Sequence, residues 1–292
     1  MQKHRVAGVE ILKRSESGEL RKTDLLAVEE PLELRLEFGD AQHREEKSLA
    51  VTMRTPGHDL ELALGFLFTE GFIKSADQVR QIFHCEQVKS EEERGNVVKI
   101  CLQPDVTVNL ANTERNFYTS SSCGVCGKES IEALSFYCKK IDSPLKIAEN
   151  ILFAAPEKMR AAQDVFEHTG GLHAAALFDQ TGELKLLRED IGRHNALDKL
   201  IGAALAEDMI PLHEYYVVVS GRVGFELVQK STAAGIPLLA AVGAPSSLAV
   251  KLADEYNMTL VGFLRDKKYN IYTGEHRIEL NQQKKLSDEN TY

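Results

Sequence analysis

Hydrophobic and polar residues alternate along the first part of the chain in the way that half-buried strands require. Between residues 28 and 38, leucines alternate with charged residues, which predicts a strand. Residues 48–54 predict a second strand, and residues 84–110 predict further strands around a charged turn. The first 25 residues are polar and mixed in charge, so we expect a loosely ordered lead-in or an edge strand there.

Helical patterns follow these strands. Asp59 is expected to cap the N-terminus of a helix over the apolar run 60–67, and Gly71 lies where a helix end favours glycine. Another helical pattern covers residues 129–140. Between the strands and this second helix, the small and polar residues of 111–128 predict a loop.

In the second half of the chain, apolar segments of strand length alternate with helical patterns. The predicted helices cover 155–168, 196–207, 225–234 and 247–256, and the predicted strands cover 172–178, 184–187, 215–219, 236–242 and 259–264. The final strands and helices form a β-α-β-α-β run with short connections, which predicts a mainly parallel sheet.

The expected fold class is therefore α/β, with a C-terminal α/β domain and a smaller N-terminal α+β portion. The expected divisions are a lead-in over 1–25, an N-terminal region over 26–150, a cofactor-binding domain over 151–280 and a polar tail over 281–292.

Charge and hydropathy narrow the classes of function. The chain has 35 Lys and Arg against 44 Asp and Glu, for a formal net charge of −9. An acidic excess repels phosphate, so we expect no nucleic-acid partner. No apolar run reaches the roughly 18 residues of a membrane span, so we expect no membrane partner. The N-terminus lacks the apolar block of a secretory signal, which indicates the cytoplasm.

Cys123 and Cys126 form the first candidate site. Two thiols at this spacing can form a disulfide, bind a metal, or carry sulfur on one thiol with the other nearby. A helix starting near Gly127 would direct backbone N–H groups at the cysteines, and Lys128 adds positive charge. Such surroundings lower a thiol pKa and favour the nucleophilic thiolate.

Two other interpretations of this cysteine pair remain open. A structural zinc site needs two further ligands, usually a second close pair, whereas Cys85, Cys101 and Cys138 stand alone. A thioredoxin-like disulfide exchanger should have the motif directly after a strand, whereas here it follows a polar loop. We therefore expect no metal site.

The second candidate site is formed by the turns that follow three predicted strands. They are Ser220-Gly221-Arg222, the segment from Gly243 through Ser246 to Ser247, and Arg265-Asp266-Lys267-Lys268. Parallel strands place such turns at one edge, where glycines, hydroxyls and cations suit an anionic ligand such as a nucleotide phosphate. The standard dinucleotide and P-loop motifs are absent, and ordinary capped turns would explain the same residues.

Three further segments carry candidate chemistry. The charged run 188–195 can clamp an anion through Arg193, or can form a solvated turn with internal salt bridges. His173 lies in an apolar strand and is most simply a core histidine. His58 and Asp59 can form an acid/base pair, although a turn and a helix cap explain them better.

Several separated blocks resemble one known family, the formate dehydrogenase accessory sulfurtransferases (FdhD family). These blocks are MRTPGHDLELALGFLFTEGFI at 53–73, SSCGVCGK at 121–128, TGGLHAAALFD at 169–179, REDIGRHNALDKLIG at 188–202, VVVSGRVGFELVQKSTAAGIP at 217–237 and GFLRDKKYNIYT at 262–273. They cover most of residues 28–280 in family order, and the cysteine pair and the glycines show no departure.

This resemblance implies a sulfurtransferase. Members of the family take persulfide sulfur from a cysteine desulfurase and pass it to the molybdenum bis(molybdopterin guanine dinucleotide) cofactor of formate dehydrogenase. By analogy Cys123 carries the persulfide and Cys126 is its companion. The stretch Phe263-Leu264-Arg265-Asp266-Lys267-Lys268 matches the family's cofactor-binding segment, to which the strand-end residues Ser220, Gly221, Arg222, Gly243 and Ser246 are added.

The resemblance also implies a homodimer and a fold like that of the cytidine deaminases. Deaminase chemistry itself is not supported, because His173-Ala174-Ala175 lacks the required glutamate and the only C-x-x-C lies upstream. The alternative function is a chaperone that binds the molybdenum cofactor without moving sulfur.

Overall fold

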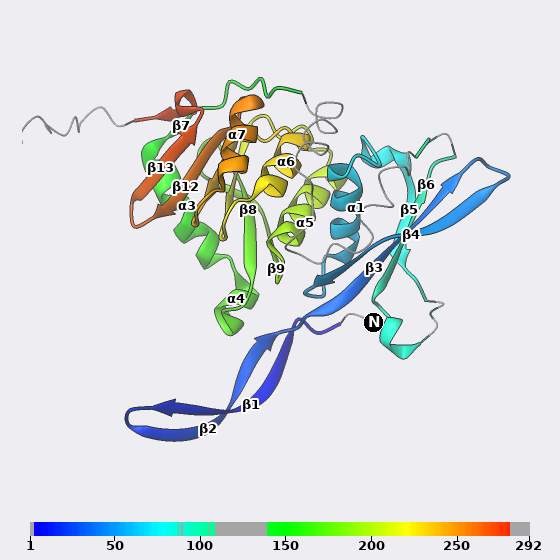
Figure 1. The fold of residues 1–292 in the computed structure, drawn as a ribbon, viewed down its shortest axis with the longest axis horizontal. Helices are drawn as coiled ribbons and strands as arrows, with labels where there is room; N and C mark the ends of the chain where they lie inside the picture. The colour runs from blue at the N-terminus through cyan, green and yellow to red at the C-terminus, as the bar shows by residue number, and fades with distance from the viewer. Residues whose placement is uncertain (1–2, 87, 89, 105, 109–138, 281–292) are drawn as a thin grey trace, which may run out of the picture.

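The computed structural model describes residues 3–86, 88, 90–104, 106–108 and 139–280. It contains two units and an arm (Figure 1). The N-terminal unit, within residues 28–108, is a four-stranded sheet with one helix. The C-terminal unit, within residues 139–280, is a six-stranded sheet with helices on both faces. The arm is a two-stranded hairpin that extends away from both units.

The N-terminal sheet has the strand order β4-β3-β6-β5. The bounds are β3 Glu30–Gly39, β4 Arg44–Arg54, β5 Val79–His84 and β6 Val97–Leu102. The alternating pattern predicted here is confirmed. Leu32, Leu34 and Leu36 of β3 are fully buried against helix α1 (Asp59–Thr69), whereas the charged residues between them lie on the other face.

The start of α1 differs from the prediction. The N-cap residue is His58, in the left-handed region with φ 57°, so the assignment of Asp59 as the N-cap is wrong. Asp59 is the first helical residue, and its buried carboxylate accepts hydrogen bonds of 3.0 and 2.9 Å from the buried guanidinium of Arg54. The carboxylate is therefore occupied by an ion pair rather than by backbone N–H groups.

The C-terminal sheet has the strand order β13-β12-β11-β10-β8-β9. The bounds are β8 His173–Asp179, β9 Leu184–Asp190, β10 Tyr215–Val219, β11 Leu238–Ala241, β12 Thr259–Arg265 and β13 Lys268–Thr273. A separate parallel pair joins β7 (Ile147–Ala148) to β14 (Ile278–Glu279). The described part of the chain is thus mixed α/β, as the sequence predicts.

The prediction of a mainly parallel sheet is wrong. Only the β10–β11 and β11–β12 pairs are parallel, whereas β8–β9, β8–β10 and β12–β13 are antiparallel. The reason lies in the connections. Each parallel pair is linked through a crossover helix, whereas β8–β9 and β12–β13 are joined by tight turns, which only antiparallel strands allow.

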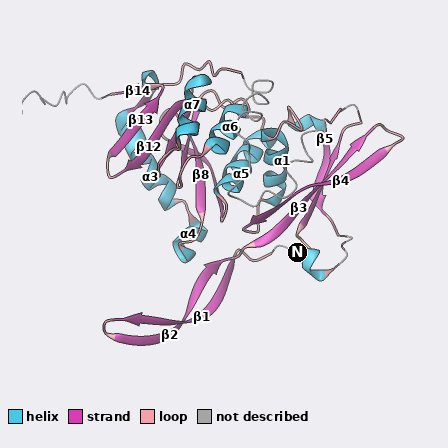
Figure 2. Ribbon diagram, viewed as in Figure 1, coloured by secondary structure: helices cyan, strands magenta, loops and turns pink. Residues whose placement is uncertain are grey.

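Helices cover both faces of this sheet (Figure 2). Their bounds are α3 Glu149–Ala161, α4 Asp164–Thr169, α5 Arg193–Ala206, α6 Phe225–Ala233 and α7 Ser247–Glu255, with 3-10 turns at Ala76–Gln78, Glu91–Glu93 and Glu275–Arg277. Helices α5, α6 and α7 bury one face of the central strands, and α3 buries the other. Burial on both faces explains why these strands are continuous apolar runs.

The two units meet where α1 packs against α5 (Figure 1). The contact is close because glycine faces backbone from both sides. A Cβ atom on Gly65 would lie 1.9 Å from the carbonyl oxygen of Asp198, and one on Gly202 would lie 1.9 Å from that of Glu61. The buried Lys230 of α6 forms ion pairs in the same region, with the buried Asp198 at 3.0 Å and the partly exposed Glu70 at 2.9 Å.

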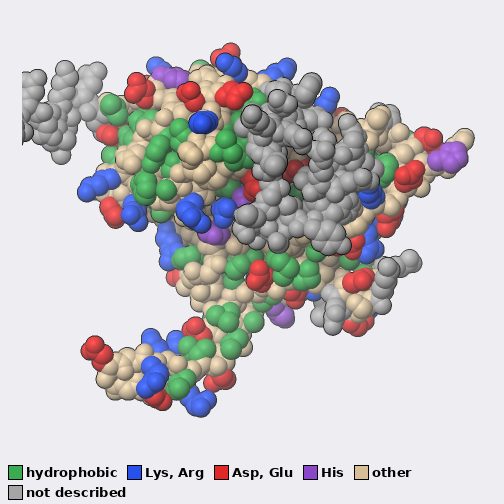
Figure 3. Space-filling model, viewed as in Figure 1, with side chains coloured by type: hydrophobic (Ala, Val, Ile, Leu, Met, Phe, Trp, Pro, Cys, Tyr) green, Lys and Arg blue, Asp and Glu red, His purple; other side chains and the backbone are tan. Residues whose placement is uncertain are grey.

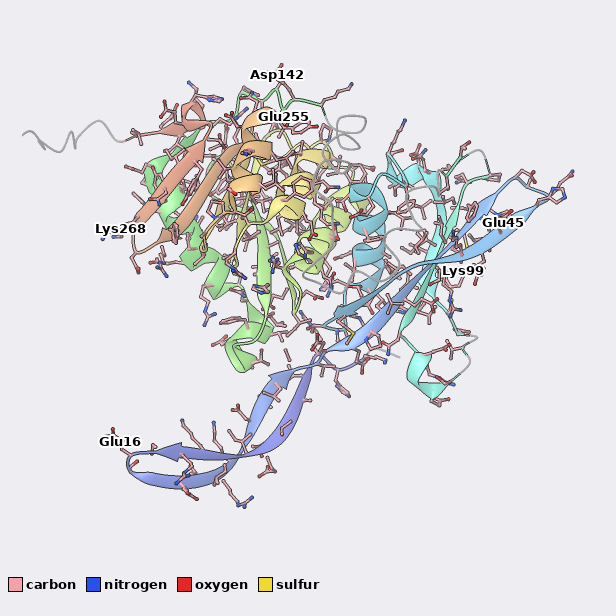
Figure 4. The ribbon with its side chains drawn as sticks, viewed as in Figure 1. Glu16, Glu45, Lys99, Asp142, Glu255 and Lys268 are labelled. Carbon is pink, nitrogen blue, oxygen red and sulfur yellow. The ribbon has the colours of Figure 1, made fainter. Side chains whose placement is uncertain are left out.

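The sequence predicts a loosely ordered lead-in or an edge strand over the first 25 residues, and the structure forms strands there, as the hairpin of the arm. Strands β1 (Val6–Ser15) and β2 (Gly18–Ala27) pair along their whole length, and Glu16 marks the tip (Figure 4). The arm meets the body at its base, where Val28 N–H donates to the carbonyl of Arg5 and β2 contacts α4. Backbone pairing of the two strands along their whole length forms a regular hairpin, although the sequence shows little alternation of apolar and polar residues.

Among the described residues, no helix combines the length and the apolar character needed to cross a bilayer. The predicted loop over 111–128, most of the predicted helix over 129–140 and the polar tail lie outside the described residues.

Candidate functional site

The carboxyl ends of the central strands lie side by side. Val242 N–H donates to the carbonyl of Val219 at 3.0 Å, which joins the end of β11 to the end of β10. Gly243 N–H donates to the carbonyl of Gly221 at 3.2 Å, and Phe263 N–H donates to the carbonyl of Gly243 at 3.0 Å. The predicted turns after β10 and β11 therefore meet, and Phe263 of β12 joins them; we call this edge the strand-end site.

Two glycines let these turns approach one another. A Cβ atom on Gly221 would lie 3.0 Å from Nδ1 of His173, and one on Gly243 would lie 2.9 Å from the carbonyl oxygen of Gly221. Any larger residue would push the β10 turn away from the imidazole or from the β11 turn. The exposed Arg222 follows Gly221 directly, so a cation stands at the same edge.

The two serines of the predicted site, Ser220 and Ser246, both accept hydrogen bonds from backbone N–H groups. The Ser220 hydroxyl oxygen accepts a hydrogen bond of 2.9 Å from Ala174 N–H, which ties the β10 turn to β8. The Ser246 oxygen accepts from Ala249 N–H at 3.2 Å and caps α7. The ordinary capped turn is thus present at Ser246, and each hydroxyl retains its own proton as a donor for a ligand.

The stretch from Phe263 to Lys268 divides into two parts. Phe263 sits at the strand-end site with φ 56° and a side chain that is 39% exposed, whereas the Leu264 side chain is buried in the core against α3. Arg265 pairs with Lys268 across a tight turn formed by Asp266 and Lys267, both at positive φ. These four exposed residues form the tip of the β12–β13 hairpin, where Figure 4 shows Lys268 at the outer edge of the sheet.

A shallow hollow lies beside this hairpin tip. Its lining includes Lys267, Lys268 and Tyr269, together with Glu149 and Phe153 of α3. The Tyr269 hydroxyl donates to Glu149 at 3.0 Å, so one wall carries a carboxylate. On the face shown in Figure 3, Lys and Arg side chains gather along the lower left of the C-terminal unit.

The strand-end site also contains His173, Arg193 and His194. His173 pairs with Asp190 at the start of β8, and Arg193 begins α5 beside it. Burial, together with the nearby Arg193 and His194, lowers the pKa of His173. His194 Nε2 lies 2.8 Å from a Glu226 oxygen, and this hydrogen bond lowers the pKa of Glu226. The cluster therefore combines the Arg193 cation and two imidazoles with the Glu226 carboxylate.

Arg193, at the start of α5, has a guanidinium nitrogen without a partner in the part of the chain that the structure describes. Its Nε is buried and has no hydrogen-bond partner among the described residues. An unpartnered buried N–H of a guanidinium costs free energy unless a ligand or water accepts from it. This atom is consistent with the interpretation of Arg193 as an anion clamp.

The rest of the charged run 188–195 is structural. Arg188 donates to both oxygens of Glu61, at 2.5 and 2.9 Å, and Glu189 accepts from the first N–H groups of α4. Asp190 accepts from Gly192 N–H at 2.8 Å and pairs with Lys199 at 2.7 Å. Internal ion pairs and hydrogen bonds therefore account for most of the run, and the anion clamp through Arg193 stays a prediction.

His58 and Asp59 do not form an acid/base pair. His58 Nδ1 lies 3.1 Å from Glu61, whereas Asp59 binds Arg54 and lies 3.6 Å from Nε2 of His84. Each side chain therefore has a partner of its own.

Cys123 and Cys126 lie outside the described residues. Cys85 and Cys101 are described as free thiols, and burial raises the pKa of both. Sequence reasoning did not single out Lys199 or Glu226. Lys199 lies in a predicted helix of mainly apolar residues. The one signal in the sequence that could have identified it is a charged residue at a position where the helical pattern predicts an apolar core residue.

The fold has a solved counterpart. A crystal structure described as that of a formate dehydrogenase accessory protein from Desulfotalea psychrophila matches with a TM-score of 0.73, over 94% of this chain and 100% of that chain. The sequence identity is 22%, so this likeness shows a shared fold. The expected likeness to cytidine deaminases stays a prediction.

The sequence matches reach further. A protein named Sulfur carrier protein FdhD from Streptomyces avermitilis is 50% identical over 263 residues, which cover 89% of this chain and 90% of that protein. A protein of the same name from Saccharolobus solfataricus is 42% identical over 274 residues, covering 94% and 98%. The model of the FdhD/NarQ family matches residues 27–279. The chain therefore belongs to the FdhD/NarQ family.

Proposed function

We propose that this protein is a sulfurtransferase that relays persulfide sulfur from a cysteine desulfurase to the molybdenum bis(molybdopterin guanine dinucleotide) cofactor of formate dehydrogenase. The observation that carries the proposal is the 50% identity to a protein named Sulfur carrier protein FdhD. The C-x-x-C pair Cys123 and Cys126 supplies the thiols that such a carrier needs.

Sulfur uptake is a thiol exchange. The Cys123 thiolate attacks the terminal sulfur of the donor's persulfide and forms a new S–S bond. The donor's own S–S bond breaks, and its cysteine leaves as a thiolate. Sulfur thus reaches Cys123 without any external oxidant or reductant.

Sulfur can leave Cys123 by two routes, and only the first of them produces a disulfide between Cys123 and Cys126. In one, the Cys126 thiolate attacks Sγ of Cys123, and the terminal sulfur leaves as hydrosulfide while the two cysteines form a disulfide. The two cysteines then supply the two electrons that reduce the sulfur. In the other, Cys126 holds the loop, and the sulfur passes directly to a molybdenum centre that supplies both electrons, which regenerates the Cys123 thiolate.

The strand-end site is the proposed docking place for a guanine nucleotide part of the cofactor. Gly221 and Gly243 lie in the turns at the carboxyl ends of β10 and β11, where parallel strands bind ligands, and Arg222 offers an exposed cation. The buried and unpartnered Nε of Arg193 can donate to a phosphate oxygen. Homodimer formation and a cytoplasmic location remain predictions from the sequence.

The central test is intact-protein mass spectrometry after incubation with a cysteine desulfurase, pyridoxal phosphate and free cysteine. We expect a reducible gain of one sulfur atom that Cys123→Ala abolishes. Cys85→Ala is the matched control, because Cys85 is a free and partly exposed thiol of the N-terminal sheet, and this variant should still gain sulfur. Absence of any gain in the wild-type protein would contradict sulfur carriage.

A cofactor-binding chaperone without sulfur transfer is the second candidate, because the cations Arg193 and Arg222 can bind an anion without a thiol. GDP binding by the wild-type protein without sulfur uptake would favour this function. Cys123→Ala should bind GDP like the wild-type protein if the two roles are separate.

Calorimetric titration with GDP assigns the anion site. Arg193→Ala should weaken GDP binding by roughly 10- to 100-fold, since a charge-assisted hydrogen bond contributes about 1.5–3 kcal/mol. Arg265→Ala should also weaken binding if the hairpin tip contacts the nucleotide, as the sequence predicts. Unchanged affinity in Arg265→Ala would remove the hairpin tip from the site.

A further inference from the structure

The Asp190 carboxylate is a buried centre of hydrogen bonds. Its side chain has no exposed surface. Oδ1 accepts from Gly192 N–H at 2.8 Å and from Asn195 Nδ2 at 3.2 Å. Oδ2 accepts from Thr55 N–H at 3.2 Å and lies 2.7 Å from Nζ of the equally buried Lys199. Together the two oxygens receive four donors.

These donors come from both units of the molecule. Thr55 directly follows β4 of the N-terminal sheet, and its carbonyl also accepts from Lys199 Nζ at 2.9 Å. Asn195 reaches the same strand, because its Nδ2 donates to the carbonyl of Met53 at 2.8 Å and its Oδ1 accepts from Thr52 at 3.1 Å. The Asp190–Lys199 pair therefore fastens the end of β4, residues 52–55, to the start of α5.

The same carboxylate fixes the turn that presents Arg193. Asp190 and Gly192 close the turn through their hydrogen bond, and Arg193 follows directly. Across the sheet, Asp190 pairs with His173, whose ring packs against Gly221 of the strand-end site. The Asp190 carboxylate thus holds the turn before Arg193, while the Asp190 backbone pairs with His173 in the register of β8 and β9.

A buried ion pair is a poor way to gain stability. Desolvation of two charges offsets their attraction, and apolar replacements are often neutral or stabilising. The Asp190 carboxylate contributes little net stability but does hold its four donors in one fixed geometry. This asymmetry points to a positioning role.

We propose that Asp190 and Lys199 are positioning residues that hold Arg193 for a nucleoside diphosphate and couple occupancy of the strand-end site to residues 52–55 of the N-terminal unit. The inference rests on the proposed function, because it takes the strand-end site as the nucleotide site. By linkage, a ligand that favours the ordered Arg193 turn also stabilises the contact with Thr55.

The test compares two buried ion pairs that both involve α5. The double variant Asp190→Asn/Lys199→Met neutralises the proposed pair without leaving a lone buried charge. The control is Asp198→Asn/Lys230→Met, which neutralises a second buried pair where α5 meets α1 and α6. GDP affinity is measured by calorimetry, and amide hydrogen exchange of residues 52–55 is measured with and without GDP.

We expect the Asp190→Asn/Lys199→Met protein to bind GDP roughly tenfold more weakly and to lose the GDP-induced protection of Thr55. The control should keep both properties, although its thermal stability changes. A milder variant, Asn195→Ala, retains both charges and should lose the same protection, so the inference stays testable if the double variant does not fold.

Wild-type affinity and protection in both Asp190→Asn/Lys199→Met and Asn195→Ala would overturn the inference. Equal losses in the control pair would also overturn it, since the effect would then follow from general destabilisation. Failure of the wild-type protein to bind GDP would refute the strand-end site itself, and the inference with it. Sulfur uptake on Cys123 would remain a separate measurement.

Discussion

The α1–α5 contact and the β1–β2 arm are built in opposite ways. At the contact, glycine faces backbone, and buried charges are paired on either side. In the arm, large apolar side chains are exposed, as Figure 3 shows in green. Their exposed fractions are Val9 42%, Leu12 47%, Leu20 62%, Leu25 43% and Leu26 44%.

The difference teaches that hydrophobicity alone does not identify the segments that hold this molecule together. The contact depends on small residues and on a few charges that have partners far away in the sequence. The arm has more apolar side chains than its own hairpin can cover, because two strands without a packed layer bury little surface. The two regions should therefore respond very differently to substitution.

The largest effect is expected at the helix contact. Gly65→Val places a side chain where a Cβ atom already lies 1.9 Å from the Asp198 carbonyl oxygen, so α1 and α5 must separate. We expect a loss of at least about 3 kcal/mol in the free energy of unfolding, or an insoluble protein. Urea denaturation is the measurement, and Gly224→Ala is the control, because nothing lies within 4 Å of its added Cβ. Wild-type stability in Gly65→Val would contradict the close contact.

A smaller and pH-dependent effect is expected at Glu61 of α1. Burial raises the pKa of Glu61, but hydrogen bonds from His58 and Arg188 outweigh burial and lower the pKa from 4.5 to about 2. A lowered folded-state pKa stabilises the protein above pH 4.5, and this stabilisation is lost as the pH falls towards 2.

Glu61→Gln should therefore lower the free energy of unfolding by about 1–3 kcal/mol near pH 7, and the deficit should shrink by roughly half near pH 3. Urea denaturation at both pH values is the measurement. Glu183→Gln is the control, since its side chain is 68% exposed and its loss should change stability little at either pH. A deficit that does not depend on pH would argue against the ion pair with Arg188.

The smallest effect is expected in the arm. Replacing Val9–Asp24 with Asn-Gly keeps the base of the hairpin and removes the exposed part. In the part of the chain that the structure describes, the polar side-chain contacts of this segment lie within the arm itself. The melting temperature should change by less than about 2 °C, as measured by calorimetry. A larger loss would show that the arm stabilises the body.

The sequence predicts elements better than it predicts their partners. The strand predicted at 215–219 is β10 with the same bounds, and the helix predicted at 225–234 is α6 within one residue. These segments succeed because both sheet faces are covered, so apolar runs follow the secondary structure closely. The arm was not predicted as a hairpin, because its regularity comes from backbone pairing rather than from a buried face.

The candidate site was predicted only in part for the same reason. Gly221 and Gly243 meet because they follow the neighbouring parallel strands β10 and β11, which a β-α-β pattern indicates, whereas Phe263 lies within β12. The division of the run 188–195 could not be foreseen. Arg188 binds Glu61 at a separation of 127 residues, and Asp190 binds Thr55 at a separation of 135 residues. No local pattern carries such pairings.

The α1–α5 contact also has a consequence for the order in which the protein acquires its structure on the ribosome. Each sheet is built from one continuous stretch of chain, residues 30–102 and residues 173–273, so each can form as its own stretch emerges. Helix α1 emerges early, whereas its partner begins at Arg193. At roughly 5–20 residues per second, α1 waits on the order of ten seconds for its partner. During that interval the face of α1 around Gly65 is not covered by α5 and can be bound by chaperones. We therefore expect misassembly to be most frequent before α5 has been synthesised.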